Sequence, residues 1–194
     1  ATLPAYTSGD LQGNMLYGSV LSGRIQAVDI SSALYPIHIA SSAIALGTPD
    51  ATIVRGGYVY IANSNSVDIY SIATSTRPDF VSTIAVSGAN RMDISGNYLY
   101  VAASTAPHIQ IIDISNPKNP VLVASQTMAS AASNVTVKGD MAYAAGSGYF
   151  ATIDVSNPLA PSTTQSFGVS SLGTEIQGSY AYVASTNIFR VLSI

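Results

Sequence analysis

The residues of this sequence that could do chemistry stand closest together in the stretch IQIIDISNPKNP, at 109–120. Asp113, Ser115 and Asn116 supply an acid, a hydroxyl and an amide there, which are side-chain types found in acid–base and nucleophilic sites. The same order of residues also fits a turn. An Asp at a strand end accepts hydrogen bonds from the following backbone amides, and proline ends the strand. The stretch therefore has a catalytic and a structural interpretation.

Few other residues support the catalytic interpretation. His38 and His108 are the only histidines, they stand at non-equivalent positions, and no G-x-S-x-G nucleophile turn is present. Two histidines without any cysteine also fall short of a transition-metal site. We therefore predict no catalytic residues and no enzyme activity, and we interpret both histidines as surface residues.

The parts of the opening stretch recur at a fixed interval along the chain. Related copies stand at 25–36, 67–78 and 150–161, with a shortened one at 189–194, and their closing prolines are spaced by 42, 42 and 41 residues. A second marker, a Gly followed by a short run that ends in Tyr, recurs at Tyr17, Tyr60, Tyr100, Tyr143 and Tyr182. Ser71 and Ser193 replace the Asp in two copies. This favours the structural interpretation, since a capping residue tolerates Ser and a unique catalyst does not.

Each repeat of about 40 residues contains four short alternating segments separated by Gly, Asn, Asp or Ser, and no helical period is present. The pattern predicts an all-β fold, a β-propeller of about five four-stranded blades in a single domain, 1–194. We expect the repeat units at roughly 8–45, 46–87, 88–129, 130–169 and 170–194.

The two ends of the repeat pattern do not decide whether the blades close into a ring. Residues 1–7 could supply a shortened outer strand that closes a five-blade ring, which we favour, or the ring could be incomplete or part of a larger one. An open ring would leave a sheet edge exposed to another chain. Because the sequence begins without Met, we expect the chain to be processed or cut from a longer protein.

The sequence DISNP with a second Pro, together with GNYLYVA at 96–102 and GSYAYVA at 178–184, resembles the LVIVD-repeat family. The resemblance covers essentially the whole chain and is weakest in the second copy, where Ser71 replaces the Asp. It implies a β-propeller in an extracellular or cell-surface protein of bacteria or archaea. It implies no reaction.

The scarce charge of the chain is concentrated just ahead of the marker glycines. Asp, Glu, Lys and Arg make up only 9% of the residues, against about 25% in ordinary soluble domains. Three positions before the marker stand Asp10, Asp93 and Glu175, with Ile53 and Thr136 in the other repeats, and one position before it stand Gln12, Arg55, Ser95, Lys138 and Gln177. Carboxylate oxygens suit calcium. The innermost strands could therefore hold a channel site for a small polar ligand or for calcium, with the three acids as candidate calcium ligands. A solvated channel without any ligand explains the same residues, and we expect no cofactor.

The loops between the second and third strands are small, neutral and rich in hydrogen-bonding groups: SVLSG, NSNS, STAPH, GSGY and STN. With Tyr149 and Phe150 as an aromatic platform, they could form a carbohydrate site. Ordinary turn chemistry explains the same residues without any ligand.

Composition limits the classes of partner. A net charge of −3 gives no basic surface for nucleic acid, and no apolar run approaches the roughly 18 residues of a membrane span. A neutral polar surface suits a secreted protein or a subunit buried in an assembly. We therefore expect a non-enzymatic extracellular or cell-surface structural module that binds a protein partner or self-assembles. The alternative is a propeller that binds carbohydrate or calcium.

Overall fold

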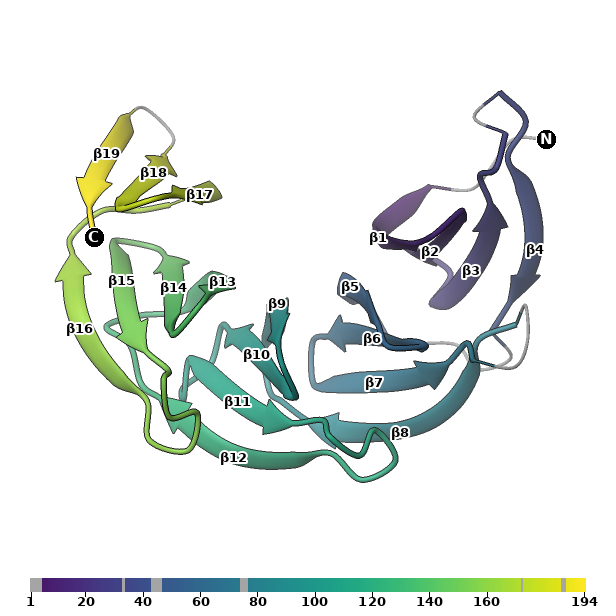
Figure 1. Ribbon diagram of the computed structural model, residues 1–194, viewed down its shortest axis with the longest axis horizontal. Coiled ribbons are helices and arrows are strands. Elements are labelled where there is room, and N and C mark those ends of the chain that lie inside the picture. Colours follow the sequence, from purple (N-terminus) through teal and green to yellow (C-terminus); the bar gives the residue numbers. More distant parts are fainter. Residues whose placement is uncertain (1–4, 33, 43–46, 74–76, 172, 186–187) are drawn as a thin grey trace. The chain divides into compact units, whose positions relative to one another are not determined.

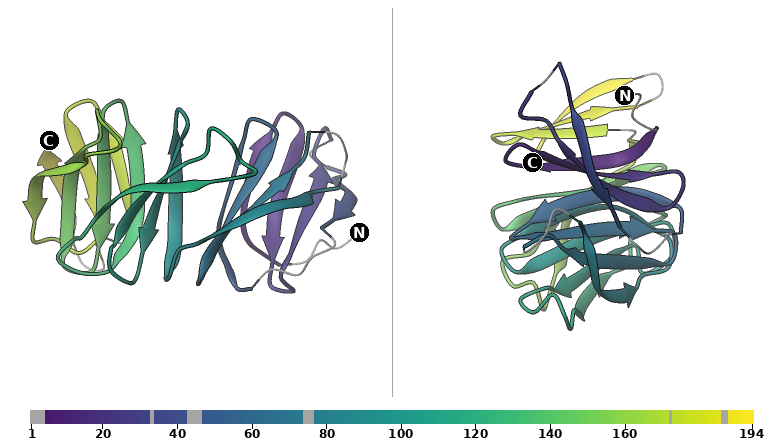
Figure 2. Two further views of the ribbon diagram at one scale, coloured as in Figure 1. Left: turned by 90° about the horizontal axis from the view of Figure 1, so that it is seen from below. Right: turned by 90° about the vertical axis from the view of Figure 1, so that its right-hand side faces the viewer.

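A computed structural model describes residues 5–32, 34–42, 47–73, 77–171, 173–185 and 188–194. Its strands form five antiparallel sheets in which the strand order follows the chain (Figures 1 and 2). This confirms the predicted all-β class and its repeated propeller blades. The described part of the chain contains no helix that could cross a membrane.

Each sheet is one blade. Blade 1 contains β1 (Tyr6–Gln12), β2 (Met15–Val20), β3 (Arg24–Asp29) and β4 (Ile37–Ser41). Blade 2 contains β5 (Pro49–Arg55), β6 (Tyr58–Asn63), β7 (Ser66–Ser71) and β8 (Asp79–Ala85). Blade 3 contains β9 (Ala89–Ser95), β10 (Tyr98–Ala103), β11 (Ile109–Asp113) and β12 (Val121–Gln126). Blade 4 contains β13 (Ala132–Lys138), β14 (Met141–Gly146), β15 (Tyr149–Asp154) and β16 (Ser162–Phe167). Blade 5 contains β17 (Gly173–Gln177), β18 (Tyr180–Ala184) and β19 (Phe189–Ser193).

The start of the chain bears on the predicted closing strand at 1–7. Residues 1–4 lie outside the described residues. Tyr6 pairs with Val20, so residues 6 and 7 begin the first strand of blade 1 and do not form a separate outer strand.

Contacts divide the chain into two compact units. The first comprises Ala1–Ala89 with Ser115–Pro120, and the second comprises Asn90–Ile114 with Val121–Ile194. Within the first unit, Ser82 Oγ donates a hydrogen bond to Pro117 O at 2.6 Å. Residues 115–120 of the stretch IQIIDISNPKNP therefore belong to the first unit.

The marker glycines make the turn between the first two strands of every blade. Their φ angles lie between 57° and 60°: Gly13, Gly56, Gly96, Gly139 and Gly178. A Cβ atom added at any of them would meet no atom within 4 Å, so space does not require glycine there. The left-handed backbone conformation is what requires glycine, because residues with a side chain rarely adopt it. This requirement explains why the marker recurs in all five repeats.

The Asp of the repeated stretch ends the third strand as a turn residue. Asp29 Oδ1 and Asp154 Oδ1 each accept from the backbone amide two residues on, at 2.8 and 2.9 Å. In the second repeat, Ser71 Oγ accepts from the Ala73 amide at 3.4 Å. The amide and hydroxyl of Ser31 lower the pKa of Asp29, and the hydroxyl and amide of Ser156 lower the pKa of Asp154, because these hydrogen bonds favour the charged form.

The Asn of the same stretch makes the next turn. Asn116 Oδ1 accepts from the Lys118 amide, and Asn157 Oδ1 from the Leu159 amide, both at 3.2 Å. Side-chain bonds of this kind hold a turn in place without any ligand. The structural interpretation of the stretch therefore accounts for its polar residues.

Blades within each unit pack face to face. We call the face that contacts the next blade along the chain the forward face, and the opposite one the rear face. The forward face carries the marker tyrosine, the residue two after it, and the first and third apolar positions of the repeated stretch.

Three buried clusters join forward faces to rear faces. The forward faces of blades 1, 3 and 4 contribute Tyr17, Ile25 and Ala27; Tyr100, Ile109 and Ile111; and Tyr143, Ala145 and Phe150. The rear faces of blades 2, 4 and 5 contribute Val54, Val59 and Ile61; Val135, Ala144 and Ile153; and Ile176, Ala181 and Val183. Burial of this apolar area is the main force holding neighbouring blades together.

Candidate functional site

Two of the predicted calcium ligands bind backbone amides of the neighbouring blade. In the first unit, Asp10 Oδ1 accepts from the amide of the next residue, and Oδ2 accepts from Val54 N of blade 2, both at 2.8 Å. In the second unit, Asp93 Oδ1 accepts from the next residue at 2.8 Å, and Oδ2 accepts from Val137 N of blade 4 at 2.7 Å. Each carboxylate joins the first strands of two blades, an arrangement that we call the carboxylate clip.

The clip uses both oxygens of each carboxylate. A charged acceptor makes shorter and stronger hydrogen bonds than a neutral one, so each clip is a firm link at the edge of its sheet. A calcium ion would have to compete with these two amides for the same oxygens.

Glu175 holds the equivalent position in blade 5 but has a different partner. Lys138 Nζ donates to Glu175 Oε1 at 3.2 Å and also to Ile176 O. The Glu175 side chain is 78% exposed. Exposed ion pairs of this kind contribute about 0.2–1 kcal/mol. Lys138 therefore links blade 4 to blade 5 from the position just before the marker glycine.

No three Asp, Glu or His side chains come together as a metal site among the described residues. Asp10 belongs to the first unit, and Asp93 and Glu175 belong to the second. Within each unit, these carboxylates are brought to backbone amides or to a lysine, and not to one another.

The five polar residues predicted to line a channel end the first strand of their blades: Gln12, Arg55, Ser95, Lys138 and Gln177. Ser95 is half-buried and the other four are exposed. Their place in a central channel stays a prediction.

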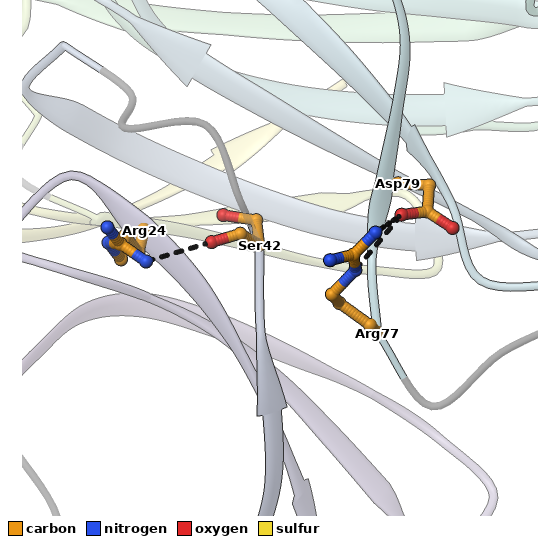
Figure 3. A network of polar contacts seen from close by, with 4 residues as sticks. All are labelled: Arg24, Ser42, Arg77 and Asp79. Carbon is orange, nitrogen blue, oxygen red and sulfur yellow. Dashed lines mark hydrogen bonds and ion pairs between the residues drawn. The ribbon is translucent and has the colours of Figure 1, made fainter.

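Two further arginines of the first unit are bound locally (Figure 3). Arg24 Nη1 donates to Ser42 O at 3.3 Å, just after the outer strand β4. Arg77 donates to Asp79 Oδ1 through Nη2 at 2.9 Å and Nε at 3.2 Å, at the start of the outer strand β8. Both arginines therefore fix the ends of outer strands.

The two rings predicted as a carbohydrate platform are buried. Tyr149 is 3% exposed and Phe150 is 0% exposed, on opposite faces of blade 4. Phe150 stacks on Tyr143, with ring centroids 6.4 Å apart. The prediction that these rings offer a surface for a sugar is wrong, because the neighbouring blades cover both. Residues 186 and 187 of the STN loop lie outside the described residues.

The histidines make separate local contacts. His108 Nδ1 accepts from the Met128 amide at 3.1 Å, which leaves the proton of the neutral ring on Nε2. His38 is exposed, and its Nε2 lies 3.0 Å from Ser41 Oγ. His108 therefore holds the chain after β12, and His38 lies on the surface of blade 1.

One surface that the sequence analysis missed is the forward face of blade 5. Phe189 and Val191 are 65% and 52% exposed, whereas their counterparts Ile109 and Ile111 in blade 3 are 1% and 0% exposed. The rings of Tyr182 and Phe189 lie 6.2 Å apart on this face. The repeat alignment could have identified these residues as members of a packing face, but not as its uncovered copy.

Comparisons with known proteins agree with this architecture. The LVIVD repeat model matches residues 50–86, 81–127 and 129–168. No curated protein matches the chain.

Solved structures that match include a Lactobacillus plantarum protein, 17% identical with a TM-score of 0.82, over 99% of this chain and 69% of that one. The computationally designed protein Ika8 is 11% identical with a TM-score of 0.66, over 98% of this chain and 71% of that one. A Bacteroides uniformis protein, provisionally named a 6-phosphogluconolactonase, is 17% identical with a TM-score of 0.72, over 86% of this chain and 56% of that one. At these identities the likeness shows the fold alone.

Proposed function

We propose, since this chain belongs to the LVIVD-repeat family, that it is a non-enzymatic extracellular or cell-surface module that makes protein–protein contacts. The observation that carries the proposal is the forward face of blade 5. Tyr182, Phe189 and Val191 are partly or largely exposed there, whereas the equivalent residues of blades 1, 3 and 4 are buried against the next blade. An exposed apolar face that no blade of its own unit covers supports this proposal, because such faces are typical of interaction sites.

The absence of an enzymatic role is supported by what the reactive side chains do. Asp29, Asp154 and Asn116 hold turns, and Asp10 and Asp93 hold clips between blades. The extracellular location is supported by the charged fraction of 9% and by the locations that the family resemblance implies.

The test combines association with location. Sedimentation velocity over a hundredfold range of concentration, alone and with surface proteins of the source cells, should give a species larger than the monomer. Protease added to intact cells should remove the protein. The variant Phe189→Asp should weaken the association, and Leu159→Asp should not, because Leu159 is a similarly exposed residue (59%) outside the forward face. A monomer without any partner, or a protein protected inside the cell, would overturn the proposal.

The ligand-binding and enzymatic alternatives need separate assays. A calcium site would raise the melting temperature on addition of calcium and lower it with a chelator. A carbohydrate site would give a hit on a glycan array, and an enzyme like the one that the Bacteroides protein is named for would hydrolyse 6-phosphogluconolactone. We expect no response in any of the three assays.

A further inference from the structure

The segment between β12 and β13 is held to blade 3 through the ring of His108. Met128 N donates a hydrogen bond to His108 Nδ1 at 3.1 Å. The Met128 residue is 8% exposed and belongs to the buried cluster that joins blades 3 and 4. The contact therefore fixes the chain where it passes from one blade of the second unit to the next.

Two other hydrogen bonds hold the same segment. Ser130 Oγ donates to Ser147 O at 2.6 Å, and Asn90 Nδ2 donates to Ala132 O at 3.0 Å. Neither bond uses a group that changes its charge between pH 5 and pH 8, whereas histidine does. The contact of His108 is therefore the one of the three that acid can change.

The bond from Met128 requires the neutral ring. A backbone amide can only donate, so Nδ1 of His108 has to offer its lone pair. Protonation of the imidazole places a hydrogen on Nδ1, and two N–H groups then point at each other. Because Met128 is buried, its amide is left without an acceptor, which is unfavourable.

His38 provides an internal contrast in the first unit. Its Nε2 lies 3.0 Å from Ser41 Oγ. A hydroxyl can either donate or accept, so this contact persists when the ring is protonated and Nε2 donates. Acid therefore breaks the contact of His108 and preserves that of His38.

The groups around His108 keep their charge state between pH 5 and pH 8. The chain on either side of the contact, 103–107 and 126–132, contains no Asp, Glu, Lys or Arg. Tyr149 packs in the same cluster, and burial raises its pKa to about 12. Arg91 is the first charged residue of β9, and arginine stays charged over this range. The ring of His108 therefore determines how this contact depends on protons.

The other blades have no histidine at the corresponding position. His108 directly precedes Ile109, and the residues that precede the corresponding apolar positions are Arg24, Ser66, Tyr149 and Ile188. None of these residue types changes charge between pH 5 and pH 8. Of the three described junctions, only the one between blades 3 and 4 therefore has this acid-sensitive contact.

We propose that His108 is a proton-operated latch on the segment between β12 and β13, closed when the ring is neutral and open when it is protonated. Opening releases the Met128 amide and uncovers the Met128 side chain, while the bonds of Ser130 and Asn90 keep the start of blade 4 in place. The inference goes beyond the proposed function and does not rest on it, because it concerns the inside of the second unit and requires no partner.

Oxidation by hydrogen peroxide measures the opening. Peroxide transfers an oxygen atom to an accessible thioether and releases water, and mass spectrometry gives the rate at each methionine. Met92 and Met128 both belong to the second unit and are 7% and 8% exposed, so Met92 is a matched reference. Between about pH 7.5 and about pH 5, we expect the rate at Met128 to rise about fivefold to tenfold, as for the loss of one hydrogen bond. The rate at Met92 should stay constant, and return to neutral pH should restore the slow rate at Met128.

Two substitutions fix the latch in either state. His108→Asn supplies an amide oxygen that accepts from Met128 and takes up no proton, so oxidation of Met128 should be slow at both pH values. His108→Leu removes the acceptor, so oxidation should be fast at both. His38→Asn is the matched control and should respond to acid as the parent does. Near-ultraviolet circular dichroism at neutral pH shows that each variant is folded, and if His108→Leu is not, the comparison of His108→Asn with the parent decides.

The outcomes separate the latch from other effects of acid. A rate at Met128 that does not change with pH in the parent, or that rises equally in His108→Asn, would overturn the proposal. A parallel rise at Met92 would indicate general loosening of the second unit and would overturn it as well. Loss of the response in His38→Asn would assign it to the other histidine. The association assays of the proposed function are made at neutral pH, with the latch closed, so either proposal can fail while the other holds.

Discussion

The forward faces of blades 3 and 5 have the same pattern of residues and opposite surroundings. Ile109 and Ile111 are buried against blade 4, whereas Phe189 and Val191 remain exposed. In a repeat protein the stability is approximately the sum of each repeat and its contacts with its neighbours. Comparing the two faces therefore isolates the contribution of the neighbouring blade to stability, because the two repeats have nearly the same pattern of residues.

The largest expected effect separates the two faces directly. Ile109→Ala should lower the free energy of unfolding by about 3 kcal/mol, because it removes buried methyl groups and leaves a cavity. Phe189→Ala should change it by less than about 0.5 kcal/mol, as for other surface substitutions. Guanidinium unfolding measures both values. A large loss with Phe189→Ala would mean that its face is covered in solution, and the comparison would then fail.

The clip should show the next largest difference. Asp93→Ala leaves the amides of Ile94 and Val137 without their acceptor, at a cost of about 1–3 kcal/mol. Glu175→Ala removes only an exposed ion pair and should cost less than about 1 kcal/mol. Hydrogen exchange at the Val137 amide should accelerate in the first variant and not in the second. Equal costs would show that the clip contributes no more than the ion pair.

A third comparison sets a buried tyrosine against an exposed one. Tyr149 Oη is buried without a hydrogen-bond partner among the described residues, so Tyr149→Phe should raise stability by about 1 kcal/mol at neutral pH. Tyr180 is 51% exposed, and Tyr180→Phe should have no measurable effect. Denaturant unfolding of the two variants gives the comparison. A loss of stability with Tyr149→Phe would mean that its hydroxyl has a partner in solution.

The same tyrosine gives a dependence on alkaline pH. Burial raises the pKa of Tyr149 to about 12 from an ordinary value of 10.0, because the neutral phenol is favoured inside the protein. The folded state favours the neutral phenol, so ionisation of Tyr149 leaves stability unchanged below pH 10 and lowers it as the pH rises through about 12. The Tyr149→Phe variant should lose less stability than the parent over this range, as followed by melting temperature. If the melting temperature of the variant fell with rising pH as steeply as that of the parent, other groups would control alkaline unfolding.

The smallest effect concerns the turn after the third strand. Blade 4 has Asp154 at the start of this turn, and blade 2 has Ser71. The hydroxyl and amide of Ser156 lower the pKa of Asp154 below 3.8. Its contribution to stability is therefore present above that value and is lost as the pH falls through the lower, folded-state pKa. Asp154→Ser should make the melting temperature less sensitive to acid, and Ser71→Asp should make it more sensitive. If the melting temperature of both variants fell equally steeply with decreasing pH, this role of the turn would be contradicted.

Local features were predictable from the sequence because their causes are local. The marker glycine needs its left-handed turn, and Asp154 accepts from an amide two residues away, so both can be inferred from one repeat. The partners of Asp10 and Asp93 are 44 residues away in the next blade, at a distance that a repeat pattern does not reveal. The calcium site proposed for these carboxylates stays a prediction, and the sequence did not reveal the amides that they bind. The burial of Tyr149 and Phe150 was not predicted either, because the surfaces that cover them belong to other repeats.

The assignment of Ser115–Pro120 to the first unit has a consequence for synthesis of the chain. The first unit is complete only when residue 120 has left the ribosome, although its main segment ends at Ala89. At about 5–20 residues per second, the intervening residues take about 2–6 s to make. Strands β9, β10 and β11 precede residue 120 in the chain, so part of the second unit is synthesised before the first unit is complete. No single peptide bond separates the two units, and a truncation after residue 89 would release a first unit that lacks the hydrogen bond from Ser82 to Pro117.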